Sequence, residues 1–513
     1  MNMPIPIIDI FAGPGGLGEG FSSVRSEDGN SIFKIKLSIE KDDDAHKTLE
    51  LRAFFRQFQP KEIPPEYYAY LRREISADAL FEKYSEQYAA AKTEAWKIEL
   101  GKKNREIVKR KIGEALNGAP DWILIGGPPC QAYSLAGRSR IRGQNKRKYR
   151  EDHRHHLYKE YLQILADHQP TVFIMENVKG LLSSKRVKKE NTFDLILSDL
   201  KHPNEVDLDG TGKPLTYLLF SLSRRPIEGK EFEPKDFVLR SEDYGIPQAR
   251  HRVIILGIRK DKFNLNPDIL KKISKRVAIN EVINDLPRLR SGLSKKKDTP
   301  IEWEKAIATV ENAKWRAKVS DKINISIDRV LKRLGTGMSR GEPFIRSDKK
   351  PQKYSDWYID VNLKGVCNHE SRSHISKDLH RYFYASIFAR VNRRSPTLND
   401  FPKALLPKHK NVKEALSGSK FNDRFRVQLR GKPSTTVVSH ISKDGHYYIH
   451  YDPTQCRSLT VREAARLQTF PDNYFFAGNR TQQYHQVGNA VPPLLAHKIA
   501  IIVFKMLKKP DNV

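Results

Sequence analysis

Cysteine and long apolar runs are scarce in this 513-residue chain. Its three cysteines, Cys130, Cys367 and Cys456, lie far apart and form no Cys-x-x-Cys pair. This usage does not support a disulfide scaffold and suits a reducing cytosol. No stretch approaches the roughly 18 apolar residues that span a bilayer, and residues 1–10 lack the basic start and long apolar run of a signal peptide. We therefore expect a cytoplasmic protein without a membrane segment.

Acidic residues are scarce relative to basic ones. Lys and Arg together number 92 and Asp and Glu 61, so the formal net charge is +31. Residues 260–432 hold 40 of these basic residues against 19 acidic ones, which is two-thirds of the excess in one-third of the chain. General solubility does not require such an uneven distribution of charge, whereas a region that binds a polyanion explains it. The sequence therefore predicts that this region binds nucleic acid.

The start of the chain has the pattern of a nucleoside-binding α/β sheet. Residues 4–11 are apolar and precede a run with glycines at GxGxxG spacing, beginning at Gly13. A second strand is expected over residues 35–39, and Glu40 follows it at the spacing of a ribose-binding acid. This spacing fits a dinucleotide or any adenosine cofactor, so an NAD-linked dehydrogenase stays open as an alternative. No Gly-Lys-Ser/Thr ending is present, which argues against a phosphate-binding P-loop.

Two further expected strands end on reactive side chains. The apolar run 121–125 is stopped by two prolines and presents Cys130, and the run 171–175 delivers Glu176. Ligands bind at the carboxyl ends of strands in open α/β sheets. Taken singly, Cys130 is more commonly an inert buried cysteine, and for Glu176 a helix-capping acid is as good an interpretation as a functional one.

A pair of arginines precedes the last strand of this half. Strands are expected over residues 216–222, 236–240 and 252–258, and Arg250 and Arg252 lie at period two, which puts them on one face of a strand. Farther along, the spacing of Cys367, His369, His374 and His380 matches no standard zinc finger, so we assign no metal.

Six segments in this order resemble the motifs of the DNA cytosine-C5 methyltransferase family, of the bacterial restriction-modification type. They read FAGPGGLGEGF, GGPPCQAYS, ENV, QARHR, RSLTVREAARLQ and QVGNAVPP. The resemblance implies an α/β fold, with a Rossmann-like S-adenosylmethionine-dependent methyltransferase core and a second, basic target-recognition domain. Residues 1–259 would form the catalytic core, with a helical insertion at about 45–116. Residues 260–432 would bind DNA, and residues 433–513 would return to the core.

The resemblance also implies roles for individual residues. The S-adenosylmethionine site would be formed by Phe11, Gly13, Gly16, Glu40, Pro129, Leu157, Asn489 and Val491. Cytosine C5 is a poor nucleophile, so a thiolate must first add at C6, and Cys130 is the candidate for it. Glu176 would neutralise the charge that develops on the ring, and Arg252, with Arg250 nearby, would orient the ring or Glu176.

These roles imply a substrate and partners. A stacked base is out of reach of this chemistry, so the target cytosine would be flipped out of double-stranded DNA. The Thr435–Thr436 pair lies where the family has a threonine near the flipped nucleotide, although a threonine pair in a strand is an equally good interpretation. A monomer is expected, and a cognate restriction endonuclease acting separately is the partner implied. The alternatives are a tRNA cytosine-C5 methyltransferase, the NAD-dependent dehydrogenase, and a catalytically inactive DNA-binding protein.

Overall fold

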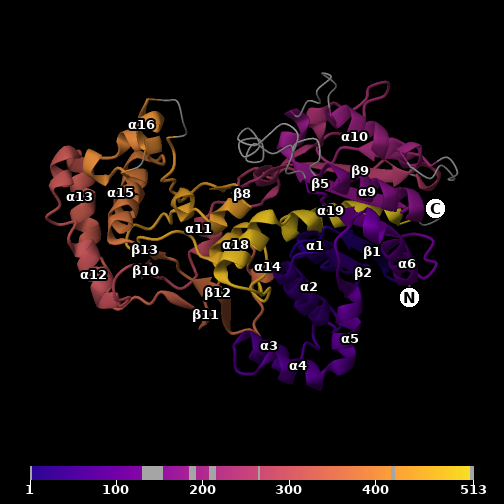
Figure 1. The fold of residues 1–513 in the computed structure, drawn as a ribbon, viewed down its shortest axis with the longest axis horizontal. Coiled ribbons are helices and arrows are strands. Elements are labelled where there is room, and N and C mark those ends of the chain that lie inside the picture. The colour runs from indigo at the N-terminus through magenta and orange to yellow at the C-terminus, as the bar shows by residue number, and fades with distance from the viewer. Residues whose placement is uncertain are drawn as a thin grey trace.

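The computed structural model describes residues 3–129, 154–183, 192–206, 215–263, 266–408, 410–417 and 422–508. Cys130, the predicted nucleophile, lies outside the described residues. The described chain forms two lobes, one built on a large sheet and one mainly helical, with β8 (Gln248–Ala249), α11 (Asn280–Ile283) and α18 (Arg480–Asn489) between them (Figure 1).

The sheet of the first lobe has eight strands in the order β3-β2-β1-β4-β5-β9-β6, with β7 also paired to β9. The strands β1 to β5 run parallel, whereas β9 is antiparallel to β5, β6 and β7. Their bounds are β1 (Ile5–Ile10), β2 (Phe33–Glu40), β3 (Ala95–Lys97), β4 (Ile123–Gly126), β5 (Val172–Val178), β6 (Tyr217–Phe220), β7 (Val238–Arg240) and β9 (His251–Arg259).

Apolar side chains cover both faces of this sheet. In β4, for example, Ile123 and Ile125 belong to the core on one face and Leu124 to the core on the other. A sheet that is buried on both faces needs such continuous apolar runs, which is why the sequence revealed these strands. One core includes α1 (Gly16–Ser22) and α19 (Pro493–Leu507), and the other includes α6 (Arg105–Leu116), α9 (Arg154–His168) and α10 (Thr192–Lys201). The predicted Rossmann-like α/β core is confirmed.

The stretch at about 45–116 is not purely helical, which corrects the prediction of a helical insertion. It contains β3, which pairs with β2 at the edge of the main sheet, and α6, which leads to β4. A three-residue edge strand is too short to show a period-two pattern, so β3 could not be recognised from the sequence. The other helices are α2 (Asp43–Arg56), α3 (Pro65–Leu71), α4 (Ala77–Lys83) and α5 (Ser85–Glu94). Together they share a core with Leu363 and Cys367 of the second lobe.

The second lobe has its own apolar core. Its elements are α11 (Asn280–Ile283), β10 (Gly292–Leu293), α12 (Pro300–Ala308), α13 (Asp321–Leu331), β11 (Gly341–Arg346), α14 (Ser355–Tyr358), β12 (Gly365–Glu370), β13 (Ser373–His374), α15 (Ser376–Asn392) and α16 (Lys410–Leu416). This core also takes in residues of α17 (Val461–Leu467) and α18 (Arg480–Asn489). The chain after residue 432 therefore packs against both lobes, and the domain boundaries at 259 and 432 stay predictions.

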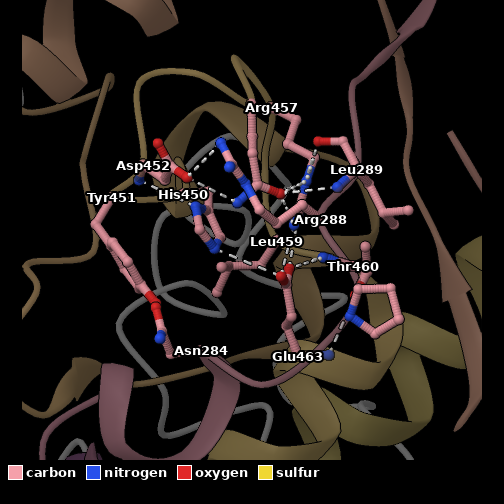
Figure 2. A network of polar contacts seen from close by, with 12 residues as sticks. Asn284, Arg288, Leu289, His450, Tyr451, Asp452, Arg457, Leu459, Thr460 and Glu463 are labelled. Carbon is pink, nitrogen blue, oxygen red and sulfur yellow. Dashed lines mark hydrogen bonds and ion pairs between the residues drawn. The ribbon is translucent and has the colours of Figure 1, made fainter. Parts of the chain in front are cut away.

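A buried polar network joins the second lobe to the chain before α17 (Figure 2). Two nitrogens of Arg457 each lie 2.7 Å from an oxygen of Glu463, and both side chains are 1% exposed. Burial lowers the pKa of the adjacent His450 to about 4, so its ring is neutral at pH 7. Arg457 also donates to the carbonyl oxygen of Leu289 at 3.2 Å. Thr460 and Glu463 form a capping box at the start of α17.

The stretch Arg480–Leu507 is the one candidate membrane span among the described helices, by length and composition alone. It consists of α18 and α19, and 61% of its most apolar window is buried inside the structure. Because α19 covers one face of the main sheet, packing accounts for its apolar character.

Two helical glycines make a matched test of the packing between α1 and α19. A Cβ added at Gly20 would clash with Ala496 and with the carbonyl oxygen of Pro493, whereas one added at the exposed Gly113 of α6 meets nothing within 4 Å. We expect Gly20→Ala to destabilise the fold by about 1–3 kcal/mol and Gly113→Ala to stabilise it by about 0.5–1 kcal/mol. Urea unfolding of both variants checks this, and equal midpoints would show that α1 and α19 are not in such close contact.

Candidate active site

The glycine-rich turn after β1 is shaped to receive a ligand. Gly13 has a positive φ of 57°, and a Cβ built there meets nothing within 4 Å. Phe11 also has a positive φ, of 53°, so the chain bends sharply as soon as the strand ends. The combination of left-handed backbone and open space allows close approach of another molecule to the main chain.

Glu40 lies at the end of β2 and is bound to this turn. Its Oε2 accepts the N–H of Gly13 at 2.8 Å, and its Oε1 accepts the N–H groups of Lys41 and Asp42, each at 2.8 Å. A carboxylate has about four acceptor positions. These three bonds therefore fix its orientation and leave an acceptor position on Oε2.

The C-terminal part of the chain closes the other side of the turn. A Cβ at Gly16 would clash with the carbonyl oxygen of Val491, so only glycine permits this approach. The hydroxyl of Tyr474 donates to the carbonyl oxygen of Pro14. Asn489, at the end of α18, is exposed and lies two residues before Val491. Tyr474 could not be identified from the sequence, because its role depends on a contact with Pro14, 460 residues away in the chain.

A carboxylate and a guanidinium meet at the carboxyl ends of β4 and β5. Glu176 Oε1 lies 2.8 Å from Arg252 Nε, and each side chain is 12% exposed. A Cβ at Gly127 would lie 3.1 Å from Glu176 Oε2, so this glycine makes room for the carboxylate beside the strand that leads to Cys130. The topology explains the pairing, because antiparallel β9 begins where β5 ends and sets Arg252 opposite Val178.

Asn177 holds the turn that precedes Cys130. Its Nδ2 donates to the carbonyl oxygen of Pro128 at 3.2 Å, and its Oδ1 accepts the N–H of Val178 at 2.8 Å. The side chain is 7% exposed. Pro129 follows, half-buried, as the last described residue of this turn. Sequence reasoning did not single out Asn177, although its place directly after Glu176 is a signal that could have found it.

Arg250 has different partners from Arg252. It is 1% exposed and donates to the carbonyl oxygens of Val437 at 2.8 Å and Gly488 at 3.3 Å. Its pKa is lowered by burial first and by the neighbouring Arg252 charge second. Arg250 therefore binds the strand end to the C-terminal part of the chain.

Another buried carboxyl lies in β1. Asp9 is 1% exposed, and burial raises its pKa to about 8, so it is neutral at pH 7. Gly18 of α1 leaves room for it, since a Cβ there would lie 3.0 Å from Asp9 Oδ2.

The remaining candidates lie around this edge. Leu157 is half-buried in α9. Thr435 lies in the two-residue strand β14 (Ser434–Thr435), which pairs with β8 (Gln248–Ala249), and Thr436 donates its hydroxyl to the carbonyl oxygen of Ala249 at 2.6 Å.

The residues considered for zinc have other partners. Cys367 contacts the carbonyl oxygen of Leu71, and His380 contacts Thr309 and the carbonyl oxygen of Ala306. His369 contacts Thr460 and Pro287, and His374 lies near Tyr382 and Ser458. These contacts account for the four side chains without a metal.

These features define a Rossmann-like α/β enzyme with its site at the carboxyl edge of the parallel strands. Comparison with known proteins identifies the family. The family model for C-5 cytosine-specific DNA methylase matches residues 77–204 and 228–505. Type II methyltransferase M.Bpa9945I of Bacillus paralicheniformis is 32% identical over 515 residues, which cover 96% of this chain and 97% of that protein.

Two less similar relatives are also methyltransferases. DNA (cytosine-5-)-methyltransferase M.ApeKI of Aeropyrum pernix is 27% identical, with 76% of this chain and 83% of that protein covered. Type II methyltransferase M.AgeI of Thalassovita gelatinovora is 26% identical, with 76% and 85% covered. The chain belongs to the C-5 cytosine-specific DNA methylase family. The predictions of a restriction-modification type enzyme that methylates C5 of cytosine in DNA are therefore confirmed.

The Asn177 contact makes a prediction about the rate. Asn177→Ala removes the donor to Pro128, and we expect kcat to fall by about 10²-fold, because the turn before Cys130 loses its fixed position, while KM for DNA changes little. Tyr161→Phe is the matched control, since Tyr161 also donates to a main-chain carbonyl oxygen, that of Ile174 in the middle of β5, but away from the site. Steady-state methylation kinetics check this, and a similar kcat for both variants would contradict the positioning role.

Proposed function

We propose that this enzyme methylates a flipped-out cytosine in double-stranded DNA at a specific short sequence, with S-adenosylmethionine as methyl donor and Cys130 as nucleophile. The observation that carries the proposal is the Glu176–Arg252 pair at 2.8 Å, beside the strand that leads to Cys130. A carboxylate is costly to bury, and here it sits at the one edge of the sheet where ligands bind.

The glycine turn and Glu40 fit the cofactor. The open space at Gly13 admits the methionine part, next to Phe11 and Gly16, and the acceptor position on Glu40 suits a ribose hydroxyl. The pocket would be completed by Pro129, Leu157, Asn489 and Val491. When bound, S-adenosylmethionine supplies an electrophilic methyl group.

Strand β3 adds a candidate for the adenine ring. Glu99 follows this strand by two residues, and the preceding Ile98 donates its N–H to the carbonyl oxygen of Glu40 at 3.1 Å. The carboxylate of Glu99 pairs with Lys41 at 2.8 Å. We assign to Glu99 the acidic contact with the adenine amino group.

Three side chains act in the proposed steps on the cytosine ring. The Cys130 thiolate forms a bond to cytosine C6, and the electron pair of the C5–C6 double bond makes C5 nucleophilic. Glu176 shares a proton with ring N3 and so neutralises the charge that develops there. Arg252 holds the Glu176 carboxylate in place. Once C5 carries the methyl group, a base removes the C5 proton and the bond to sulfur breaks; no described residue is assigned as that base, and water is the candidate.

The other predicted residues act around this centre. Arg250 is proposed as a positioning residue, because its guanidinium binds main-chain carbonyls rather than Glu176. The basic residues within 260–432 would bind phosphates and read base edges, with an affinity that falls as salt rises. We further propose that the enzyme is cytoplasmic and monomeric, and that a cognate restriction endonuclease cleaves the same sequence separately.

The nucleophile can be tested by substitution. We expect Cys130→Ser to reduce methyl transfer from labelled S-adenosylmethionine to mixed-sequence duplex DNA below detection, because a hydroxyl does not supply the thiolate. Circular dichroism should show an unchanged fold. Normal methylation by this variant would rule out the covalent step. The same assay with tRNA in place of duplex DNA tests the alternative substrate.

A 5-fluorocytosine substrate gives a second readout of the same step. Fluorine cannot leave as a proton does, so the enzyme should stay attached to the DNA in a complex that survives denaturation. The wild type should form this complex and Cys130→Ser should not.

A further inference from the structure

A cavity of about 350 Å³ opens in the second lobe, next to the strand pair β8–β14. The polar residues that line it include Ser395, Thr397, Asp423, Arg426, Lys432 and Thr435. Thr435 pairs with Ala249, only three residues before Arg252 in the chain. A ligand in this cavity would therefore lie near the catalytic edge of the sheet, although the catalytic steps themselves do not use the cavity.

Arg426 is held rigidly in the wall of this cavity. Its guanidinium pairs with Asp423 and lies 4.4 Å from the centroid of the Tyr447 ring. Tyr447 in turn donates its hydroxyl to Asp423 at 3.3 Å. The main chain of Arg426 is fixed on both sides, because its N–H donates to His446 and its carbonyl oxygen accepts from Ile449, each at 2.9 Å. The Arg426 side chain is 28% exposed.

This arrangement suits a neutral planar ligand better than a phosphate. The carboxylate of Asp423 offsets the charge of Arg426 and would repel an anion, so the pair is a poor phosphate site. Beyond its contact with Asp423, the guanidinium has further N–H donors in the same plane. Because Asp423 and Tyr447 already hold this group in place, it loses little conformational entropy when it binds a ligand. In DNA the matching partner is guanine, whose N7 and O6 both accept on the major-groove edge.

We propose that this cavity reads one guanine of the recognition sequence, with Arg426 donating to O6 and N7 and with Asp423 and Tyr447 holding the guanidinium in place. The inference rests on the proposed function and names its base-reading residue. The neighbouring Arg424 serves as a matched control: it is 53% exposed and its nearest carboxylate, of Asp444, lies 3.8 Å away.

The test compares methylation patterns on a duplex library of random sequence, with the methylated cytosines located by bisulfite sequencing. The wild type defines the recognition sequence. We expect Arg426→Ala to lose about 5- to 150-fold of discrimination at one guanine while the other positions stay selective. Arg424→Ala should keep the full sequence preference, and any effect should be a uniform loss with a weaker salt dependence.

A second measurement alters the DNA, so its wild-type arm does not depend on the folding of a variant. Replacing each guanine of the recognition sequence in turn by 7-deazaguanine removes the N7 acceptor, and one position should lose methylation strongly in the wild type but not in Arg426→Ala. The proposal is overturned if the recognition sequence has no guanine, if Arg426→Ala keeps full discrimination, or if it weakens all sequences equally, as a phosphate contact would. If the wild type methylates no cytosine at C5, the proposed function fails as well.

Discussion

The ion pair between Glu176 and Arg252 is the interaction on which the rest of the site depends. A carboxylate that is 12% exposed needs a compensating charge, and Arg252 supplies it at 2.8 Å. The pair exists because the sheet contains one reversed long strand: β9 starts where the parallel strand β5 ends. An all-parallel sheet would have put the start of that strand at the opposite edge. The antiparallel direction of β9 is thus a condition for the ion pair on which the proposed chemistry rests.

Residues far apart in the chain converge on this edge through main-chain contacts. Gly16 approaches Val491 too closely for any other residue, and Arg250 binds the carbonyl oxygens of Val437 and Gly488. The second lobe is joined to the same C-terminal stretch by the buried Arg457–Glu463 pair. The glycine turn, the Glu176–Arg252 pair and the second lobe are therefore joined through the same C-terminal stretch, and we propose that DNA bound by the lobe reaches the Glu176 edge in this way.

Much of the fold could be predicted because the buried strands are continuous apolar runs with turn residues on both sides. Strand β3 could not be predicted, because a run of three residues at a sheet edge is too short to show a hydrophobic pattern. The positions of Gly13 and Glu40 followed from the spacing of the glycine turn. The contacts of Asn177 with Pro128 and of Tyr474 with Pro14 could not be read from the chain, because each joins segments that meet only after folding. Arg250 and Arg252 share a period-two spacing, yet their partners differ, and that depends on which segment packs beside each.

The position of the transferred methyl group tests the central claim most directly, that the Glu176–Arg252 pair serves activation of a cytosine ring at C5. Duplex DNA incubated with the enzyme and isotopically labelled S-adenosylmethionine can be digested to nucleosides, and mass spectrometry then locates the label. We predict that all of it is found in 5-methyldeoxycytidine. Label on an exocyclic amine, of cytosine or of adenine, would contradict this chemistry, because methylation of an amine requires no addition to the ring.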